Sequence, residues 1–445
     1  MRMRAALLGS VVLLAAAPGA RAAPPWLKPA TIAGVARAEF PQVVFTRAGV
    51  AVVVANKIRP GRNAPIVGAV QARGATTFRR ARQLAPGDFE GGTDFGAFAP
   101  LRGSGVVALI SRVHVGLQAT IRPWLATGAP GRRLRLRQQL GAPGTFSLVR
   151  GVASNRRGDV AGVYITCNSR CSRQRVTLAA WPAGARRAHL RSIAALPANG
   201  QDYVQAAVAL DARGRLVVAY GNRRLVGVRR GTVRGRLGRA QRLARVSRPV
   251  TAITAAISDA GAALVGWAAQ GVAATAPARF GAAVAPSARR RFRPRALERW
   301  PGGANESVRG TPIRAVAAGG RLSLGWTGAE RGLYVTRLAD VVGGAVGAPQ
   351  TLTAPGLDVE LSDLAAAPSG RAIAVLQVAD PNRSRSAVYA SERPAGAAAS
   401  GALIRVSDGS RQVGGARVAL DPGGGRAVAA WLEGRTPLLR AATLP

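Results

Sequence analysis

VALDARGRLVVAY, residues 208–220, is the clearest copy of a phrase that decides the fold of this 445-residue chain. Related copies read ISDAGAALVGW (257–267), AAPSGRAIAVL (366–376) and VALDPGGGRAVAAW (418–431). Each copy is an apolar segment, a turn that contains glycine, and a second apolar segment that often ends in a large side chain. Eight copies follow one another about 54 residues apart, and a period of this length indicates one supersecondary unit that is stacked repeatedly.

The fourth unit gives the clearest view of the secondary structure within the repeat. We expect an inner strand at 206–210, a tight turn at 211–214, a buried second strand at 216–220, a third strand at 225–229 and a short outer strand at 240–243. Four short antiparallel strands per unit form the blade of a β-propeller. The sequence therefore predicts an all-β propeller of eight four-stranded blades; seven is the alternative if the second or seventh unit is inserted rather than stacked.

The two ends of the repeat region favour a closed ring. The eighth unit has only three expected strands before the chain stops, and residues 31–36 form a β-like segment that precedes the first unit. If this segment supplies the missing outer strand, the first and last blades interlock and no sheet edge stays open. The alternative is that residues 31–36 are a linker.

The chain resembles, at the level of this repeat, the secreted bacterial β-propeller proteins related to sialidase-like and WD40-like propellers. The resemblance covers about residues 31–445. Sialidases carry Asp-box turns of the form Ser-x-Asp-x-Gly-x-x-Trp, and Ser258-Asp259-Ala260-Gly261 is close to that form. Trp267 follows Gly261 by six residues instead of three, so the resemblance implies the fold and carries no sialidase chemistry.

The first 22 residues are typical of a secretory signal peptide. Met1-Arg2-Met3-Arg4 is a basic start, residues 5–17 are an apolar stretch, and Ala20-Arg21-Ala22 is a small-residue cleavage site. The apolar stretch is shorter than the roughly 20 residues that span a bilayer, which disfavours the alternative of an uncleaved anchor. We expect cleavage near Ala22, a linker at 23–30, and one propeller domain at 31–445 in a monomer that is secreted or held in the periplasm or cell envelope.

Two cysteines, Cys167 and Cys171, are the only ones in the chain. In an exported protein this spacing predicts a local disulfide in a hairpin loop. A zinc site would need two further ligands, and the chain has only two histidines, so we expect no metal at the cysteines.

The net charge of +43 points to anionic partners, namely cell-envelope polymers or a lipid surface. Nucleic acid is not the expected partner, because aromatic residues make up only 5% of the chain and are not interleaved with the arginines. The competing interpretation is that the positive charge reflects codon usage and not function. All basic residues except Lys28 and Lys57 are arginine, and a GC-rich genome produces such a composition through codon usage alone.

The arginines gather where the third and fourth strands of a unit are expected to join. These joins lie on the face opposite the loops that connect successive units. The binding candidates are Arg132, Arg133, Arg135, Arg186, Arg187, Arg289, Arg290 and Arg291.

The carboxylates are concentrated instead in the loops between units, including 37–41 and 353–362, which surround the mouth of the central channel. These loops hold ten of the 20 acidic residues: Glu39, Asp88, Glu90, Asp94, Asp202, Glu298, Glu306, Asp358, Glu360 and Asp408. Paired carboxylates are what glycoside cleavage requires, and Ca²⁺ suits oxygen-rich loops. The catalytic candidates are Asp88, Glu90, Asp94, Asp202, Glu306, Asp358 and Glu360; alternatively, the carboxylates only cap loops and offset the positive field.

We therefore expect a non-catalytic binding or scaffold protein of the cell envelope. The chain carries no Gly-x-Ser-x-Gly elbow and no phosphate-binding loop. The alternative is a carboxylate-dependent glycoside hydrolase or lyase, which two facing carboxyl groups from different blades would support. Pairing of the carboxylates with arginine would weaken it.

Overall fold

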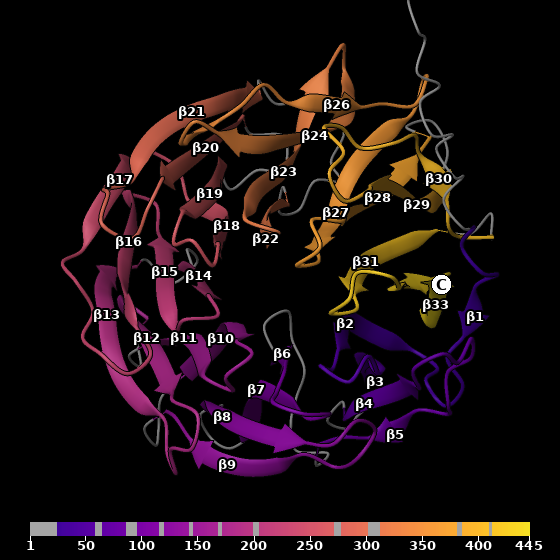
Figure 1. The fold of residues 1–445 in the computed structure, drawn as a ribbon, viewed down its shortest axis with the longest axis horizontal. Helices are drawn as coiled ribbons and strands as arrows, with labels where there is room; N and C mark the ends of the chain where they lie inside the picture. Colours follow the sequence, from indigo (N-terminus) through magenta and orange to yellow (C-terminus); the bar gives the residue numbers. More distant parts are fainter. Residues whose placement is uncertain are drawn as a thin grey trace, which may run out of the picture.

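The computed structural model describes residues 25–57, 65–85, 96–114, 120–141, 146–167, 171–198, 204–270, 277–300, 312–380, 385–408 and 412–445. This part of the chain is all-β, with strands joined by turns and loops and without a helix. Figure 1 shows its antiparallel sheets standing around a central axis. In each sheet the first strand of the unit lies innermost and the fourth lies on the outside (Figure 1).

The strand pairings follow the expected repeat. The first four units consist of β2 (Ala38–Phe45), β3 (Ala51–Lys57), β4 (Ile66–Gln71) and β5 (Arg82–Gln83); β6 (Gly96–Pro100), β7 (Val106–His114), β8 (Thr120–Gly128) and β9 (Arg135–Gln139); β10 (Phe146–Ser154), β11 (Val160–Cys167), β12 (Arg173–Trp181) and β13 (His189–Pro197); and β14 (Gln205–Leu210), β15 (Arg215–Gly221), β16 (Leu225–Thr232) and β17 (Gln241–Arg245). One parallel residue pair, Phe146 with Ile121, joins the second and third units into a single sheet.

The later units repeat this order. They consist of β18 (Val250–Ile257), β19 (Ala263–Gln270), β20 (Ala278–Ala285) and β21 (Arg293–Trp300); β22 (Ile313–Ala318), β23 (Arg321–Glu330), β24 (Leu333–Val342), the short β25 (Ala345–Val346) and β26 (Gln350–Leu352); β27 (Asp358–Ala366), β28 (Ala372–Ala379), β29 (Ser386–Arg393) and β30 (Ile404–Arg405); and β31 (Val413–Leu420), β32 (Ala427–Glu433) and β33 (Leu438–Leu444). The expected strands of the fourth unit agree with the observed ones to within a few residues.

The first and last strands of the described chain meet in the sheet of the eighth unit. The first described strand, β1 (Ala30–Thr31), pairs antiparallel with β33, with Ala30 opposite Ala441. This strand is shorter and starts earlier than the expected segment 31–36, because the chain turns at Ala33 and Gly34. Next to it, the side chain of Gln71 in the first unit hydrogen-bonds Thr443 Oγ1 at 2.9 Å.

The turn between the first two strands of each unit depends on a left-handed glycine. In the fourth unit Gly214 has φ 82°, and its N–H donates to the carbonyl of Asp211 at 3.1 Å. The buried Asp211 side chain completes the turn, because its Oδ1 accepts the N–H groups of Arg213 and Arg215 at 2.9 and 2.8 Å.

Six of the glycines that recur at the same place in the repeat have a positive φ: Gly49, Gly158, Gly214, Gly261, Gly320 and Gly370. In the second and eighth units the left-handed residues are Gly103 and Gly424, and not Gly105 and Gly425, which align with these six. Both turns contain more than one glycine, so the repeat phrase alone does not determine which one takes the left-handed conformation.

The large side chain that closes the repeat phrase packs on a glycine of the third strand. Trp267 lies directly opposite Gly281, and a Cβ atom on Gly281 would come within 2.3 Å of Trp267 Cζ2. Tyr220 lies opposite Gly227 in the same way, with a closest approach of 2.6 Å. The glycine therefore makes the room that the aromatic ring fills.

The hydrophobic core lies between neighbouring sheets. One cluster joins Leu178 and Ile193 of the third unit to Leu216 and Tyr220 of the fourth. The second strands are the most buried elements, and every residue of β19 is buried. The sheets thus stabilise one another through both faces of each second strand.

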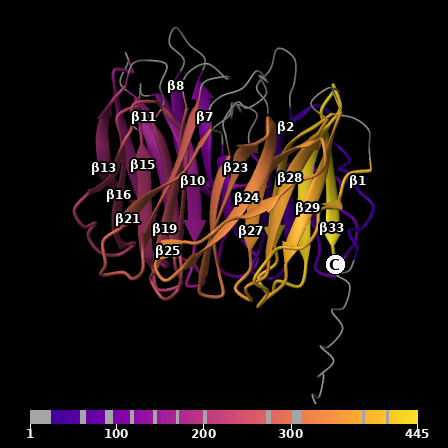
Figure 2. The same cartoon turned by 90° about the horizontal axis from the view of Figure 1, so that it is seen from above.

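Alternating strand direction gives the ring two distinct faces, which Figure 2 shows from the side. We call the turn face the one that carries the turns from first to second strand and from third to fourth strand. The opposite face carries the loops from second to third strand and the loops between units.

Candidate functional site

The eight arginines expected to bind partners lie on the turn face or at its outer edge. They occupy the turn from β8 to β9 and the first residue of β9, the turn from β12 to β13, and the turn from β20 to β21: Arg132, Arg133, Arg135, Arg186, Arg187, Arg289, Arg290 and Arg291. All eight are exposed. We call this set the arginine rim.

The arginine rim forms no ion pair with an acidic residue of the described chain. Other arginines serve the fold, because they donate to backbone carbonyls of the next unit. Arg191 binds the carbonyls of Thr232 and Val233 at 3.1 and 2.9 Å, and Arg230 binds that of Ser287 at 3.0 Å. The rim arginines make no such side-chain contact with the described residues, so their positive charge faces solvent.

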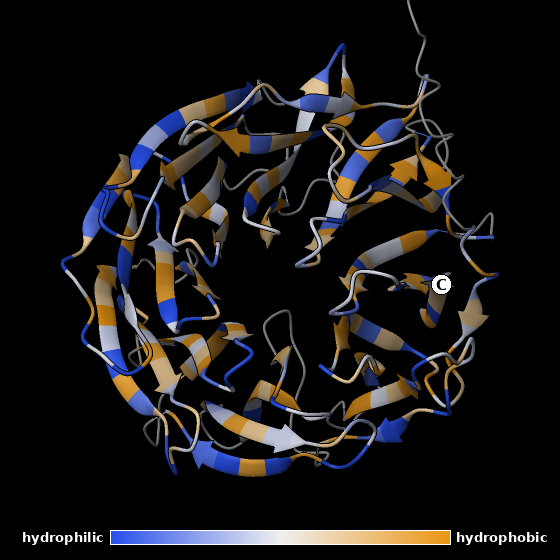
Figure 3. Ribbon diagram, viewed as in Figure 1, coloured by the Kyte–Doolittle hydropathy of each residue, from blue (hydrophilic) through white to orange (hydrophobic). Residues whose placement is uncertain are grey.

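The positive charge is unevenly distributed around the ring. Figure 3 shows hydrophilic residues along the outer strands β9, β13, β17 and β21, which belong to the second to fifth units. In β21 the arginines Arg293, Arg295 and Arg299 are exposed as well. The outer strands β26, β30 and β1 are much shorter, and Arg405 is their only arginine. The first unit carries exposed Arg79, Arg80 and Arg82 in and just before its outer strand β5, so the basic surface extends over the first five units.

Two of the acidic candidates, Asp358 and Glu360, lie at the start of the innermost strand β27. The expectation that they sit in a loop is wrong, because Val359 and Leu361 are buried and the alternation of polar and apolar residues continues the strand to Asp358. Glu39, expected in the loop 37–41, likewise lies in strand β2.

Asp358 and Glu360 lie close enough to Tyr334 of β24 to shift its pKa, and Asp358 also shifts the pKa of Glu360. The backbone N–H of Tyr334 donates to Asp358 Oδ1 at 2.8 Å. Burial, and then the charge of Asp358, raises the pKa of Glu360 to about 7. Burial raises the pKa of Asp358 as well, although the Tyr334 N–H opposes this effect. Burial, Glu360 and Asp358 together raise the pKa of the Tyr334 phenol to about 12.

Other carboxylates near the loops between units are paired with arginine. Glu298 accepts hydrogen bonds from Arg337 Nε and Trp326 Nε1, both at 2.9 Å. Asp408 accepts one from Arg440 Nη2 at 2.8 Å. These two groups stabilise the fold and are not available as free carboxylates.

The remaining catalytic candidates lie outside the described residues: Asp88, Glu90, Asp94, Asp202 and Glu306. Within the described ranges, no three His, Cys, Asp or Glu side chains come together as a metal site. The structure thus brings together Asp358 and Glu360, and it adds Tyr334, which no sequence pattern had indicated.

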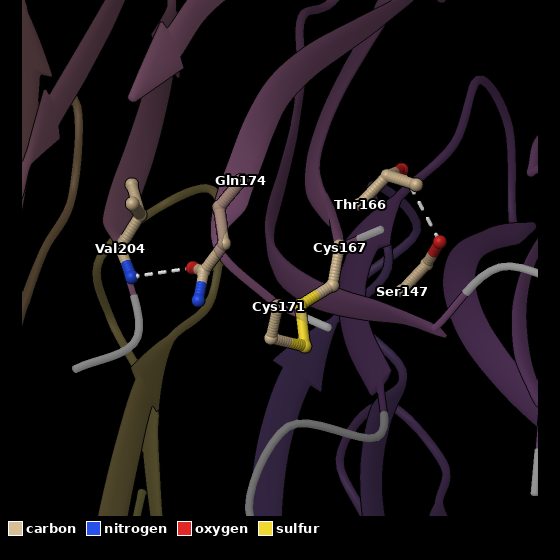
Figure 4. The surroundings of a disulfide bond; sticks show 6 residues. All are labelled: Ser147, Thr166, Cys167, Cys171, Gln174 and Val204. Atoms are coloured by element: carbon tan, nitrogen blue, oxygen red, sulfur yellow. Dashed lines mark hydrogen bonds between the residues drawn. A yellow bond between two sulfur atoms is a disulfide. The ribbon is translucent and has the colours of Figure 1, made fainter. Parts of the chain in front are cut away.

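The predicted disulfide is confirmed. Cys167 ends strand β11, Cys171 precedes β12, and their sulfur atoms are bonded with Cα atoms 4.9 Å apart (Figure 4). Beside the bond, Ser147 Oγ lies 3.2 Å from Thr166 Oγ1, and Gln174 Oε1 accepts the N–H of Val204 at 2.8 Å. The disulfide therefore joins the end of β11 to a residue just before β12 on the opposite face.

Among the described residues, there is no helix with the length and apolar character that crossing a membrane requires.

No protein-family model matches the chain, and no curated protein matches it either. Its resemblance to other proteins is therefore found in solved structures alone.

An ulvan lyase, described as a new family of polysaccharide lyase, has a TM-score of 0.50 at 9% identity; the match covers 94% of this chain and 95% of the lyase. The β-propeller domain of the Trilobed protease from Pyrococcus furiosus has a TM-score of 0.42 at 10% identity, and the match covers 85% of this chain and 97% of that domain. The α-L-arabinanase of Penicillium chrysogenum has a TM-score of 0.41 at 9% identity, and the match covers 94% of this chain and 98% of the arabinanase.

The ulvan lyase is a β-propeller protein that matches over nearly the whole of both chains, so the resemblance expected from the repeat is confirmed for the fold. At such low identity the likeness concerns the fold alone.

Proposed function

We propose that this chain is an exported, non-catalytic β-propeller that binds anionic surfaces of the cell envelope through its arginine rim. The signal-like residues 1–22 support export, and the pairing of β1 with β33 supports a ring of eight blades that β1 completes. The chain would then be one rigid disc that presents the arginine rim to its partner.

The observation that carries this proposal is the exposure of the eight rim arginines without an ion-pair partner in the described chain. Codon usage alone would spread arginines over the surface without regard to position. In this protein, the arginines that contact neighbouring units are distinct from those of the rim, which lie at the joins of third and fourth strands in the second, third and fifth units. A basic surface of this kind suits a flat anionic partner, to which each exposed arginine contributes Coulomb attraction.

Vesicle binding tests the proposal. Purified mature protein should co-sediment with vesicles of phosphatidylglycerol and phosphatidylcholine at low salt. The protein should dissociate from the vesicles when the ionic strength rises above about 0.1 M, where the Debye length is about 10 Å. Pure phosphatidylcholine vesicles should not retain it. Absence of binding at low salt, or retention that does not depend on salt, would contradict the proposal.

A second candidate function rests on Asp358, Glu360 and Tyr334. A carboxyl group whose pKa is near 7 beside a second carboxyl group is the arrangement in which one acts as acid and the other stays ionised. This arrangement favours a glycoside hydrolase or lyase. Both carboxyl groups come from one strand, however, and not from facing blades.

A screen of polysaccharides for release of reducing or unsaturated ends, with Glu360→Gln as the control, distinguishes the two functions. Turnover that the variant loses would establish the enzyme. No turnover by the wild type leaves the binding function as the better account.

A further inference from the structure

A cavity of about 390 Å³ opens at the turn face. Residues from all eight units line it, and they lie at the ends of the innermost strands and in the turns that follow them. Because the innermost strands surround the central axis, this cavity is the turn-face end of the central channel (Figure 1). It is separate from the arginine rim, which lies in the turns to the outer strands and at their outer edge.

The second residue of the first turn in each unit determines the chemistry of this cavity. Seven of the residues at this position line it: Arg47, Arg156, Ala212, Asp259, Gly320, Pro368 and Pro422. The repeat therefore places two arginines on one arc of the wall, in the first and third units. Small residues and prolines occupy most of the other positions and leave the space open.

The acidic and basic members of this set differ in their partners. Asp259 Oδ1 accepts the N–H of Ala212 at 2.8 Å, and the nearby Asp421 accepts the N–H of Arg426 at 3.0 Å. Arg47 and Arg156 make no side-chain hydrogen bond or ion pair with a described residue. Arg47 Nε is buried and has no hydrogen-bond partner among the described residues. A buried donor of this kind is costly unless a ligand satisfies it.

The two arginines also repel each other. Burial and the charge of Arg156 lower the pKa of Arg47 from its ordinary value. Guanidinium groups nevertheless stay charged at physiological pH, so the repulsion persists. An anion between the two groups would remove it and would supply acceptors for Arg47 Nε.

We propose that Arg47 and Arg156 bind the phosphate group of a small molecule at the turn-face end of the central channel. The two guanidinium groups place a charge of about +2 on their arc of the wall, which the nearly dianionic phosphate of an ester balances at neutral pH. The two carboxylates of the lining, Asp259 and Asp421, come from the fifth and eighth units. The volume of about 390 Å³ exceeds what one phosphate fills and lies in the range of small-molecule sites, so the phosphate is carried on a larger molecule.

Calorimetric titration with glycerol 3-phosphate and with inorganic phosphate tests this site, and acetate serves as a monoanionic comparison. The wild type should bind both phosphates saturably with one site per chain. The double variant Arg47→Ala/Arg156→Ala should lose about tenfold or more in affinity, because two charge-assisted contacts are removed. The Arg47→Lys/Arg156→Lys variant keeps the charge and should retain part of the binding.

Arg132→Ala/Arg133→Ala is the matched control, since it removes two exposed rim arginines and should leave phosphate affinity unchanged. Circular dichroism and the unfolding temperature of each variant confirm that it is folded. Non-saturable phosphate binding, equal affinity for acetate, or equal loss in the channel and rim variants would overturn the proposal. Vesicle binding should follow the rim variant alone, so this site and the surface-binding function succeed or fail separately.

Discussion

Gln241 and Phe292 are joined by two hydrogen bonds across the boundary between the fourth and fifth units. The Gln241 side chain donates to the carbonyl of Phe292 at 2.7 Å and accepts its N–H at 3.1 Å. Gln138 binds Ala188 in the same way, and Gln350 binds Ser400. Three boundaries of the ring thus use one side-chain amide to satisfy both backbone groups of a neighbouring turn.

Removal of this amide should destabilise the ring. Gln241→Ala leaves an N–H and a carbonyl of the buried Phe292 without partners, so we expect a loss of about 1–3 kcal/mol in the free energy of unfolding. Gln138→Ala should cost a similar amount, and the double variant should show the sum because the two sites share no partner. Urea denaturation measures all three.

Gln205→Ala is the control, because the Gln205 side chain makes no hydrogen bond with the described residues. Its stability should stay within about 0.5 kcal/mol of the wild type. If the Gln138→Ala/Gln241→Ala variant is no less stable than either single variant, the two boundaries are not independent.

Gly281 should tolerate no side chain while Trp267 is in place. Gly281→Ala would force the Trp267 ring from its position, and overpacking of this kind costs about 1–3 kcal/mol. Gly414→Ala is the matched control, since a Cβ atom there meets nothing within 4 Å. Thermal unfolding should show a clear drop for the first variant and little change for the second. An equal effect at both positions would mean that strand glycines act only through backbone entropy.

Glu360 should make the stability depend on pH. Its pKa is raised to about 7 in the folded protein, so the unfolded chain loses its proton first as the pH rises. The free energy of unfolding should therefore fall between about pH 4.5 and 7, by at most about 3 kcal/mol, and level off above that range. Glu360→Gln should remove this fall and be more stable than the wild type at pH 8.

The comparison with Glu330→Gln checks this assignment. Glu330 is exposed, and its substitution should keep the pH dependence of the wild type. Denaturant midpoints measured from pH 4 to 8.5 give the three curves. If Glu360→Gln and Glu330→Gln have the same slope, the burial of Glu360 does not determine it.

The repeat phrase was sufficient to predict the strands, because apolar segments and a glycine turn recur in each unit. The alternation at Asp358 and Glu360 extends strand β27 by residues that had been assigned to a loop. The side-chain amides of Gln138, Gln241 and Gln350 bind residues about 50 positions further along the chain, in the next unit. No local sequence pattern predicts such a contact.

The arginine pair of the channel illustrates the same limit. Arg47 and Arg156 lie two units apart and become neighbours only because the innermost strands surround one axis. Alignment of the second turn residue across the repeats could have found them. The position of the rim, by contrast, could be predicted from the clustering of arginines in the turns between third and fourth strands.

The most direct test of the account compares two charge reversals of equal size. Arg186→Glu/Arg187→Glu acts on the arginine rim, whereas Arg223→Glu/Arg224→Glu acts on exposed arginines of the opposite face. Binding to phosphatidylglycerol vesicles at low salt should fall about tenfold or more for the first and change little for the second, since each arginine near an anionic surface contributes about 1 kcal/mol. Equal losses for the two variants would show that net charge alone drives binding and would contradict a surface formed by the rim.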